Sequence, residues 1–353
     1  MLETDTVDLK QKAVMTTRRL IDTDAASERY RARSIDLGRK RLLITNLRGS
    51  EEEADLTVPP NCHGFGRIRH FRRATSTGWP PNPLPLVPAC KALGIPTSEV
   101  LRAQAFQSAA CNWRCWYCYV PFGLLAASRR YSDWFTPDQL VNLYLAEPDP
   151  PLLIDLTGGQ PDLVPEWVPW MMAALRERGL DHNTYLWSDD NLSTDYLWRY
   201  LSLPDLDLMA SYRNYGKVGC FKGFDAHSFS FNTRTHPALF DRQFELMDRL
   251  IDLGLDIYAY ATFTTPARPE GDIRTGVTRF VDRLQGIDPN LPLRTVPLEV
   301  AVYTPVQPRL HEEQVEAMAF QRIAVVAWNE ELQSRFTDSE RDRPISDVSL
   351  RHR

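Results

Sequence analysis

The sequence predicts an α/β fold, namely a partial (β/α)6 barrel of the TIM type with a loop-rich N-terminal extension and a C-terminal helix. Between residues 101 and 303, short apolar runs alternate with helical segments, a pattern typical of parallel strands joined by helices. About six such units fit this stretch, too few for the eight units of a closed barrel. The 353 residues are 43% hydrophobic and 25% charged, so a sizeable core is expected and disorder throughout is excluded.

Residues 1–100 are expected to form an extension, polar and then rich in proline, that packs on the barrel. A helix is predicted near 16–33, and the apolar run 42–47 predicts a strand. Residues 59–96 contain many prolines, which fix φ and remove amide donors. We therefore predict neither a helix nor a central strand there, but an extended segment on the surface of another domain.

In the second unit, 101–303, apolar runs predict the strands and amphipathic stretches predict the helices. Thr136 is a favoured N-cap before a proline, while Gly179 and Gly254 are placed to end two helices. Strands are predicted over 103–109, 151–157, 183–187, 206–211, 218–221, 255–263 and 295–303. Helices are predicted over 137–147, 165–178, 194–201, 237–253 and 273–284. The third unit, 304–353, is predicted to be a long helix over 311–335 and a loose, charged tail from residue 337.

The charge pattern excludes some classes of protein. No run of 18 apolar residues exists, so no membrane span is predicted. The acidic start of the chain lacks the features of a secretory signal, so we expect a cytoplasmic protein with reduced thiols. The six cysteines are then ligands or buried thiols rather than disulfides. The net charge of −5 argues against general nucleic-acid binding.

Basic residues are concentrated near the N-terminus, where residues 1–75 carry 15 basic and 11 acidic side chains. One interpretation is a solvated face on the extension. The other is a docking surface for an anionic substrate, an acidic protein or RNA. The two basic stretches comprise Arg29, Arg31, Arg33, Arg39, Lys40 and Arg41, and then Arg67, Arg69, Arg72 and Arg73, with His63 and His70 among the latter.

Three cysteines within eight residues, Cys111, Cys115 and Cys118, lie on a predicted loop and can converge on one metal centre. A structural zinc site usually needs four protein ligands. An iron–sulfur cube has four irons that each take a ligand, so three cysteines leave one iron free to bind a substrate or cofactor. The spacing favours such an open cluster. The alternative is a zinc site whose fourth ligand is one of three residues outside the loop, Cys62, His63 or Cys90.

This spacing, with the aromatic Tyr117 before the last cysteine, resembles the signature of the radical S-adenosylmethionine (radical SAM) superfamily. The resemblance implies one 4Fe-4S cluster held by the three cysteines, with S-adenosylmethionine bound at its open iron. It also implies reductive cleavage of S-adenosylmethionine, hydrogen abstraction from a substrate by the resulting 5′-deoxyadenosyl radical, and an external electron donor such as flavodoxin or ferredoxin.

Two further motifs follow predicted strands and resemble parts of the same superfamily. The turn after Thr157 is similar to its Gly-Gly-Glu-Pro motif, which implies a role in binding the methionine part of the cofactor, although glutamine replaces glutamate. Ser188 and Asp189 stand where the superfamily often has a polar residue near the cofactor, so Asp189 is a candidate for holding ribose hydroxyls. Their other interpretation is an N-cap or turn cluster. The turn consists of Gly158, Gly159, Gln160 and Pro161.

The segment around Lys222 resembles the glycyl-radical activating enzymes, which implies that Lys222 binds S-adenosylmethionine and that the reaction is an oxidoreduction. Cys220 replaces the aspartate that these enzymes have two residues before the lysine. Cys220 is either a hydrogen donor or ligand, or a buried small hydrophobe. The substrate, a protein or a small molecule, is not predicted, and no general acid or base stands out. The competing hypothesis is a non-catalytic, zinc-stabilised binding module with a basic N-terminal docking surface.

Overall fold

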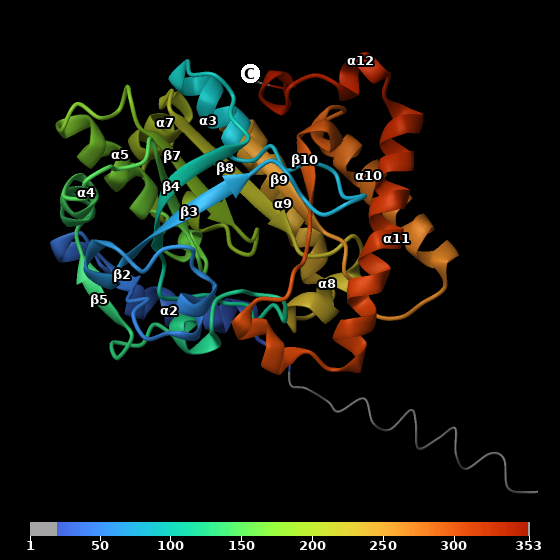
Figure 1. The fold of residues 1–353 in the computed structure, drawn as a ribbon, viewed down its shortest axis with the longest axis horizontal. Coiled ribbons are helices and arrows are strands. Elements are labelled where there is room, and N and C mark those ends of the chain that lie inside the picture. Colours follow the sequence, from blue (N-terminus) through green and yellow to red (C-terminus); the bar gives the residue numbers. More distant parts are fainter. Residues whose placement is uncertain (1–19, 352–353) are drawn as a thin grey trace, which may run out of the picture.

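A curled sheet of seven strands forms the centre of the fold in the computed structural model, which describes residues 20–351 (Figure 1). Its strands are β3 (Gly66–Arg72), β4 (Val100–Gln107), β6 (Leu153–Thr157), β7 (Tyr185–Asp190), β8 (Tyr215–Phe221), β9 (Ile257–Thr262) and β10 (Thr295–Leu298). Their order is β10-β9-β8-β7-β6-β4-β3. All neighbours from β4 to β10 pair in parallel, and β3 adds an antiparallel edge strand. The predicted partial TIM-like barrel is confirmed.

Helices cover the convex face of this sheet, as the ribbon shows for α4, α5 and α9 to α11 (Figure 1). Phe221 of β8 illustrates the core between the layers, because its ring packs on Phe244 and Phe280 of the covering helices. The helices are α2 (Thr23–Ser34), α3 (Leu86–Leu93), α4 (Pro137–Leu145), α5 (Trp167–Glu177), α6 (Tyr196–Tyr200), α7 (Leu203–Ser211), α8 (Ala226–Thr233), α9 (Leu239–Asp252), α10 (Glu270–Ile287), α11 (Glu312–Arg335) and α12 (Asp338–Arg341). No helix within residues 20–351 has the length and apolar character needed to cross a bilayer.

The concave face of the sheet is apolar where the strands begin and polar where they end. Leu153, Trp187 and Tyr258 form a buried cluster there with Ala89 of α3 and with Ile345 near the C-terminus. This cluster closes the amino end of the partial barrel. The carboxyl ends of the strands, where ligands bind in other sheets of this kind, are the polar end of this face.

Residues before 101 contribute to the barrel as well as packing on it. Besides β3, they supply β1 (Ile35–Asp36) and β2 (Arg41–Thr45), which form a small antiparallel sheet with β5 (Ser132–Phe135). The proline-rich segment 73–85 bridges the two free edges of the large sheet, β3 and β10 (Figure 1). The Trp79 indole donates to the carbonyl of Pro297 at 3.0 Å, and the amide of Ser76 donates to Glu299 at 3.2 Å. This segment closes the lateral opening of the partial barrel.

The structure corrects the prediction of a strand over 206–211, where it has the helix α7. Ser202 and Asp205 form a capping box, and Pro204 occupies the first turn, where no amide donor is needed. Leu206 and Met209, three residues apart, are the buried positions. A short apolar run does not show whether apolar residues repeat every 2 residues, as in a strand, or every 3.6 residues, as in a helix. The capping residues were therefore the better signal of secondary structure.

The prediction for 59–96 was wrong where the helix α3 forms, whereas β3 is an edge strand, which the prediction did not exclude. Between Pro60 and Pro80 the chain has no proline, which leaves the amides of β3 free to pair. In α3, Pro88 lies in the first turn and removes no intrahelical hydrogen bond. The predicted helix near 16–33 corresponds to α2, while 16–19 lie outside the described residues.

The C-terminal tail is packed rather than loose up to residue 351. Ile345, Val348 and Leu350 are buried. Arg351 donates to Asp252 at 3.1 Å and so ties the tail to α9. Although the tail is rich in charged residues, its three apolar side chains are buried and cover the barrel.

Candidate functional site

The three predicted cysteine ligands lie on the loop that leaves the carboxyl end of β4. Cys111 is buried, and Cys115 and Cys118 are partly exposed. Each interacts electrostatically with the others, so the three thiols face a common space. Burial raises the pKa of Cys115 to about 12 and that of Cys118 to about 11, with a further rise from the neighbouring thiols. Thiols must lose their protons to bind a metal, so metal binding here would release protons.

The three loop thiols supply three of the four ligands that either a zinc ion or a four-iron cluster takes. Among residues 20–351, no three His, Cys, Asp or Glu side chains converge closely enough to hold one metal ion. A zinc ion, with Zn–S bonds of about 2.3 Å, draws its ligands to one point. A four-iron cube is a larger body whose thiolate ligands stand farther apart. Three thiols on one loop would supply the three protein ligands of an open four-iron cube and leave one iron without a protein ligand.

Neither of the two cysteines considered as a fourth zinc ligand shares the space of the loop thiols. The electrostatic neighbour of the Cys62 thiol is the carboxylate of Glu147, and the amide of Cys62 donates to the same carboxylate at 2.9 Å. Cys90 lies in α3, at the opposite end of the barrel. His63 is exposed in the loop before β3.

Side chains from distant elements anchor the cysteine loop. The amide of Asn112 donates to Ser27 of α2 and to Ser193 after β7, both at 2.8 Å. Asn191 donates to Asn112 at 3.0 Å and lies 3.9 Å from the Cys111 sulfur. Arg309, in the C-terminal unit, donates to the carbonyl of Cys118 at 2.6 Å. We did not predict these residues, because only the folded chain brings them to the loop.

The predicted glycine turn packs directly against this loop. Gly158 and Gly159 have φ of +63° and +59°, a region that favours glycine. A Cβ on Gly158 would lie 2.3 Å from the side chain of Gln107, and one on Gly159 would lie 2.2 Å from the carbonyl oxygen of Ala110. The lack of a side chain at these two positions therefore lets the turn pack closely against Gln107 and Ala110. We had expected it to let a ligand come close to the backbone.

Gln160 is buried and joins the turn to the end of β7. Its amide nitrogen donates to Asp190 at 2.7 Å, and its oxygen accepts from the amide of Asn191 at 2.9 Å. A glutamate at this position would place two carboxylates side by side. The presence of Asp190 thus gives a physical reason for glutamine in a turn that otherwise resembles Gly-Gly-Glu-Pro.

Ser188 and Asp189, neighbours in sequence, point to opposite faces of the sheet. Ser188 is buried on the helix-covered side, where its hydroxyl lies 2.8 Å from that of Tyr215. Asp189 faces the barrel interior and accepts a hydrogen bond from Thr157. The alternation of side chains along a strand allows only one of the two to face the cysteine loop, and it is Asp189.

Lys222 extends from the end of β8 toward the loop. It interacts electrostatically with Cys220, Tyr117, Cys115 and Cys111. The hydroxyl of Tyr117 lies 3.1 Å from that of Thr262 at the end of β9. The predicted residues Tyr117 and Lys222 therefore lie close to the loop cysteines, at the carboxyl ends of β8 and β9.

A second set of polar side chains lies on the inner face of β3, β6 and β7. Arg69 donates to buried Asp155 at 2.6 Å and to Thr157 at 3.4 Å. Burial raises the pKa of Asp155 to about 7, and nearby Asp189 adds to the rise, while Arg69 opposes it. The concave face thus carries a buried carboxyl that titrates near neutral pH.

We expect this carboxyl to make the stability of the protein depend on pH. Asp155 has a pKa of about 3.9 in the unfolded chain and about 7 in the native state. The folded state binds the proton more tightly, so this contribution to stability is complete below pH ~4 and is lost as the pH rises toward 7. Urea unfolding should show the wild type losing stability relative to Asp155→Asn over this range, by at most about 1.4 kcal/mol per pH unit. A difference that stays constant with pH would contradict this assignment.

The structure divides the residues of the two basic stretches, because three arginines are paired with carboxylates inside the protein while others, such as Arg33 and Arg72, are exposed. Arg31 is buried and donates to Glu166 at 2.9 Å. Arg67 is buried and pairs with Glu52. Arg69 is paired with Asp155, as described above. These arginines compensate buried carboxylates, so the two basic stretches do not form one solvated face.

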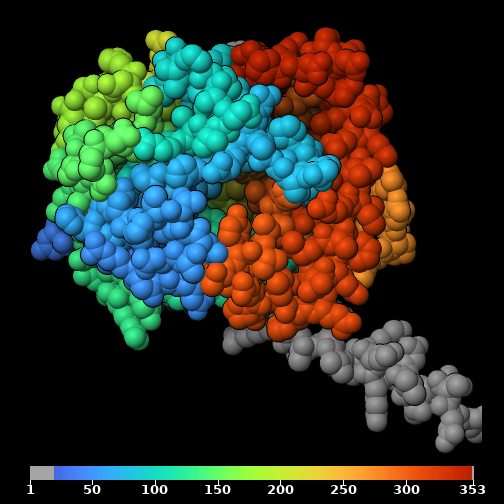
Figure 2. All heavy atoms as spheres, viewed as in Figure 1, coloured from blue at the N-terminus to red at the C-terminus, as the bar shows by residue number. Residues whose placement is uncertain are grey.

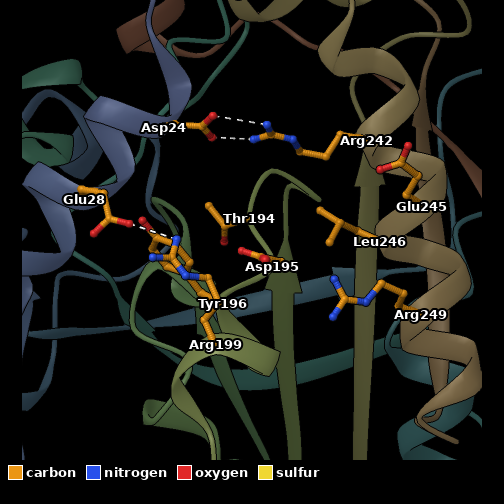
Figure 3. A pocket seen from close by; sticks show the side chains of 10 residues that line it. All are labelled: Asp24, Glu28, Thr194, Asp195, Tyr196, Arg199, Arg242, Glu245, Leu246 and Arg249. Carbon is orange, nitrogen blue, oxygen red and sulfur yellow. Dashed lines mark hydrogen bonds and ion pairs between the residues drawn. The ribbon is translucent and has the colours of Figure 1, made fainter.

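Ion pairs also hold α2 against the barrel around a cavity of about 330 Å³ between α2, α6 and α9 (Figure 3). Asp24 accepts from Arg242 at 2.6 Å, and Glu28 accepts from Arg199 at 3.0 Å. Since α2 also supplies Ser27 to the cysteine loop, these pairs support the site indirectly. None of the predicted ligands lines this cavity.

No family model and no curated protein matches the chain. Solved structures that match include SuiB of Streptococcus suis bound to the precursor peptide SuiA, with 16% identity and a TM-score of 0.36 over 51% of this chain and 36% of that one. SuiB bound to S-adenosylmethionine matches with 16% identity and a TM-score of 0.37, over 52% of this chain and 37% of that one. The matched region thus spans well under half the length of SuiB.

Proposed function

We propose that this protein is a radical SAM enzyme in which Cys111, Cys115 and Cys118 hold one 4Fe-4S cluster. The observation that carries the proposal is the loop of three mutually interacting thiols at the carboxyl ends of the strands of a partial barrel. When bound, such a cluster supplies the electron that cleaves S-adenosylmethionine into methionine and a 5′-deoxyadenosyl radical. An external protein such as flavodoxin or ferredoxin would deliver that electron.

The residues around the loop have distinct tasks in this proposal. Lys222 places a positive charge beside the thiols and suits the carboxylate of S-adenosylmethionine. Asp189, on the concave face, suits the ribose hydroxyls. The turn from Gly158 to Pro161 would hold the methionine part through its backbone. Trp116, buried and bonded through its indole to Asn232 at 3.0 Å, helps to keep water from the loop.

Within this class, the Lys222 segment favours an oxidoreductase similar to the activating enzymes. The reaction would begin with abstraction of a hydrogen atom from the substrate. Asp155 and Arg69 are two further charged groups that the barrel interior offers to such a substrate, because they lie on the concave face near Asp189.

The test is anaerobic reconstitution with iron and sulfide, followed by metal and product analysis. We expect a brown protein with about four irons per chain that forms 5′-deoxyadenosine from S-adenosylmethionine when reduced. A colourless protein that binds zinc tightly and gives no 5′-deoxyadenosine would refute the proposal and support the binding-module hypothesis.

A further inference from the structure

A cavity of about 350 Å³ opens beside the cysteine loop and is lined by residues of the 51–57 segment, of β3 and by Tyr303. In the space-filling view a hollow lies between the blue N-terminal, the cyan proline-rich and the orange C-terminal segments (Figure 2). Tyr119, one residue after Cys118, forms part of the wall, and its ring meets that of Tyr303 edge to face at 6.1 Å between centroids. The cavity thus leads from the surface toward the candidate site.

Both carboxylates in the wall of this cavity are already occupied. Glu52 pairs with Arg67 and accepts from Gln107 at 3.3 Å. Asp55 accepts from the amide and from the hydroxyl of Thr304, each at 2.9 Å. Glu52 is thus neutralised by Arg67, whereas Asp55 accepts only from uncharged donors and keeps its negative charge.

Two other arginines of the same wall keep hydrogen-bonding capacity. Arg69 uses only its Nη1 atom, on Asp155 and Thr157, and no partner of its Nε or Nη2 atoms is found among residues 20–351. Its guanidinium lies over the ring of Phe71 at 4.3 Å, which fixes its orientation. Arg72 is exposed and has no ion pair within the described part of the chain. Among the lining residues, three arginines therefore stand against the two carboxylates Glu52 and Asp55, a formal excess of one positive charge before Asp155, the partner of Arg69, is counted.

We propose that this cavity binds an anionic group of the substrate, a carboxylate or a phosphate, at the edge of β3, with Arg69 on the inner side of the strand and Arg72 on its other side. The proposal rests on the proposed function, since it treats the cavity as the entrance for the substrate. Arg69 connects the two spaces, because its partner Thr157 donates to Asp189, the candidate ribose ligand. A substrate whose anionic group sits on Arg69 would extend its remaining part toward the carboxyl ends of β6 and β7.

The first test measures anion binding on the purified chain without reconstitution. The probes are inorganic phosphate, followed by ³¹P line widths, and acetate, followed by saturation-transfer NMR. We expect Arg72→Gln to weaken binding of the preferred anion about ten-fold, as expected for loss of one charge-assisted hydrogen bond. Arg73→Gln is the matched control, because Arg73 is exposed, lies 3.7 Å from Glu99 and does not line the cavity. Absence of binding by both anions, or equal effects of the two variants, would overturn the proposal.

The test of Arg69 needs a variant that does not leave the Asp155 carboxylate buried without its partner. The double variant Arg69→Gln/Asp155→Asn removes both charges together and should abolish anion binding. Asp155→Asn alone keeps Arg69 and removes its competing carboxylate, so it should bind the anion at least as tightly as the wild type. Equal binding by the double and the single variant would exclude Arg69 as a ligand. Because these measurements need neither iron nor S-adenosylmethionine, their failure is distinguishable from failure of the proposed function.

Discussion

Cys115→Ala will abolish both iron loading and formation of 5′-deoxyadenosine. Cys115 is the central thiol of the loop and interacts electrostatically with both Cys111 and Cys118. With two thiols left, the loop offers too few ligands for a stable four-iron cube. Its side chain is only partly buried, so the alanine variant should lose little of the free energy of unfolding. Iron per chain, the visible absorption of the cluster and product yield measure the effect.

The matched control for this variant is Cys90→Ala. Cys90 is a buried thiol in α3, next to Ala89 of the cluster at the amino end of the barrel, and the loop cysteines are not among the groups that shift its pKa. We expect this variant to load iron and to cleave S-adenosylmethionine like the wild type. Full iron content in Cys115→Ala, or equal losses in both variants, would show that the loop is not the ligand set.

Gly159→Ala will destabilise the protein and displace the cysteine loop. At a φ of +59°, an alanine is strained by about 1–2 kcal/mol. Its Cβ would also lie 2.2 Å from the carbonyl oxygen of Ala110 and 2.9 Å from that of Ser108, both backbone atoms without freedom to move aside. Overpacking of this kind adds about 1–3 kcal/mol. Because Ala110 directly precedes Cys111, we expect reduced iron loading in the fraction that folds.

Gly179→Ala separates backbone strain from steric conflict. Gly179 has a φ of +65°, and nothing lies within 4 Å of the Cβ position. This variant should lose only the strain, about 1–2 kcal/mol, and should load iron normally. Urea unfolding and iron content of the two variants, compared side by side, check the prediction. If both variants behaved alike, close packing against the loop would not be the reason for glycine at 159.

The turn that follows β6 has a structural as well as a proposed functional role. The amide of Gln160 donates to the carbonyl of Ala110 at 2.7 Å, and its side chain bonds to Asp190 and Asn191. Asn191 in turn approaches Cys111. One continuous network thus joins the ends of β4, β6 and β7 and orients the first cysteine before anything binds.

The alternation of apolar runs and helical stretches was sufficient to predict the partial barrel, and the spacing of Cys111, Cys115 and Cys118 was sufficient to place them on one loop. Both are local patterns. A strand buried on both faces is a continuous apolar run, and ligands within a stretch of eight residues lie close together without any contact from distant elements.

Only the tertiary structure decided which charged side chains are available to bind a ligand. Arg67 and Arg69 have the same charge and lie two residues apart on the same side of β3, yet Arg67 is committed to Glu52 while Arg69 retains free donors. Their partners come from 15 and 86 residues away along the chain. The same holds for Ser188 and Asp189, which strand alternation sends to opposite faces. Whether a charged side chain meets a ligand or a buried counter-charge depends on contacts between distant segments, and no local pattern encodes them.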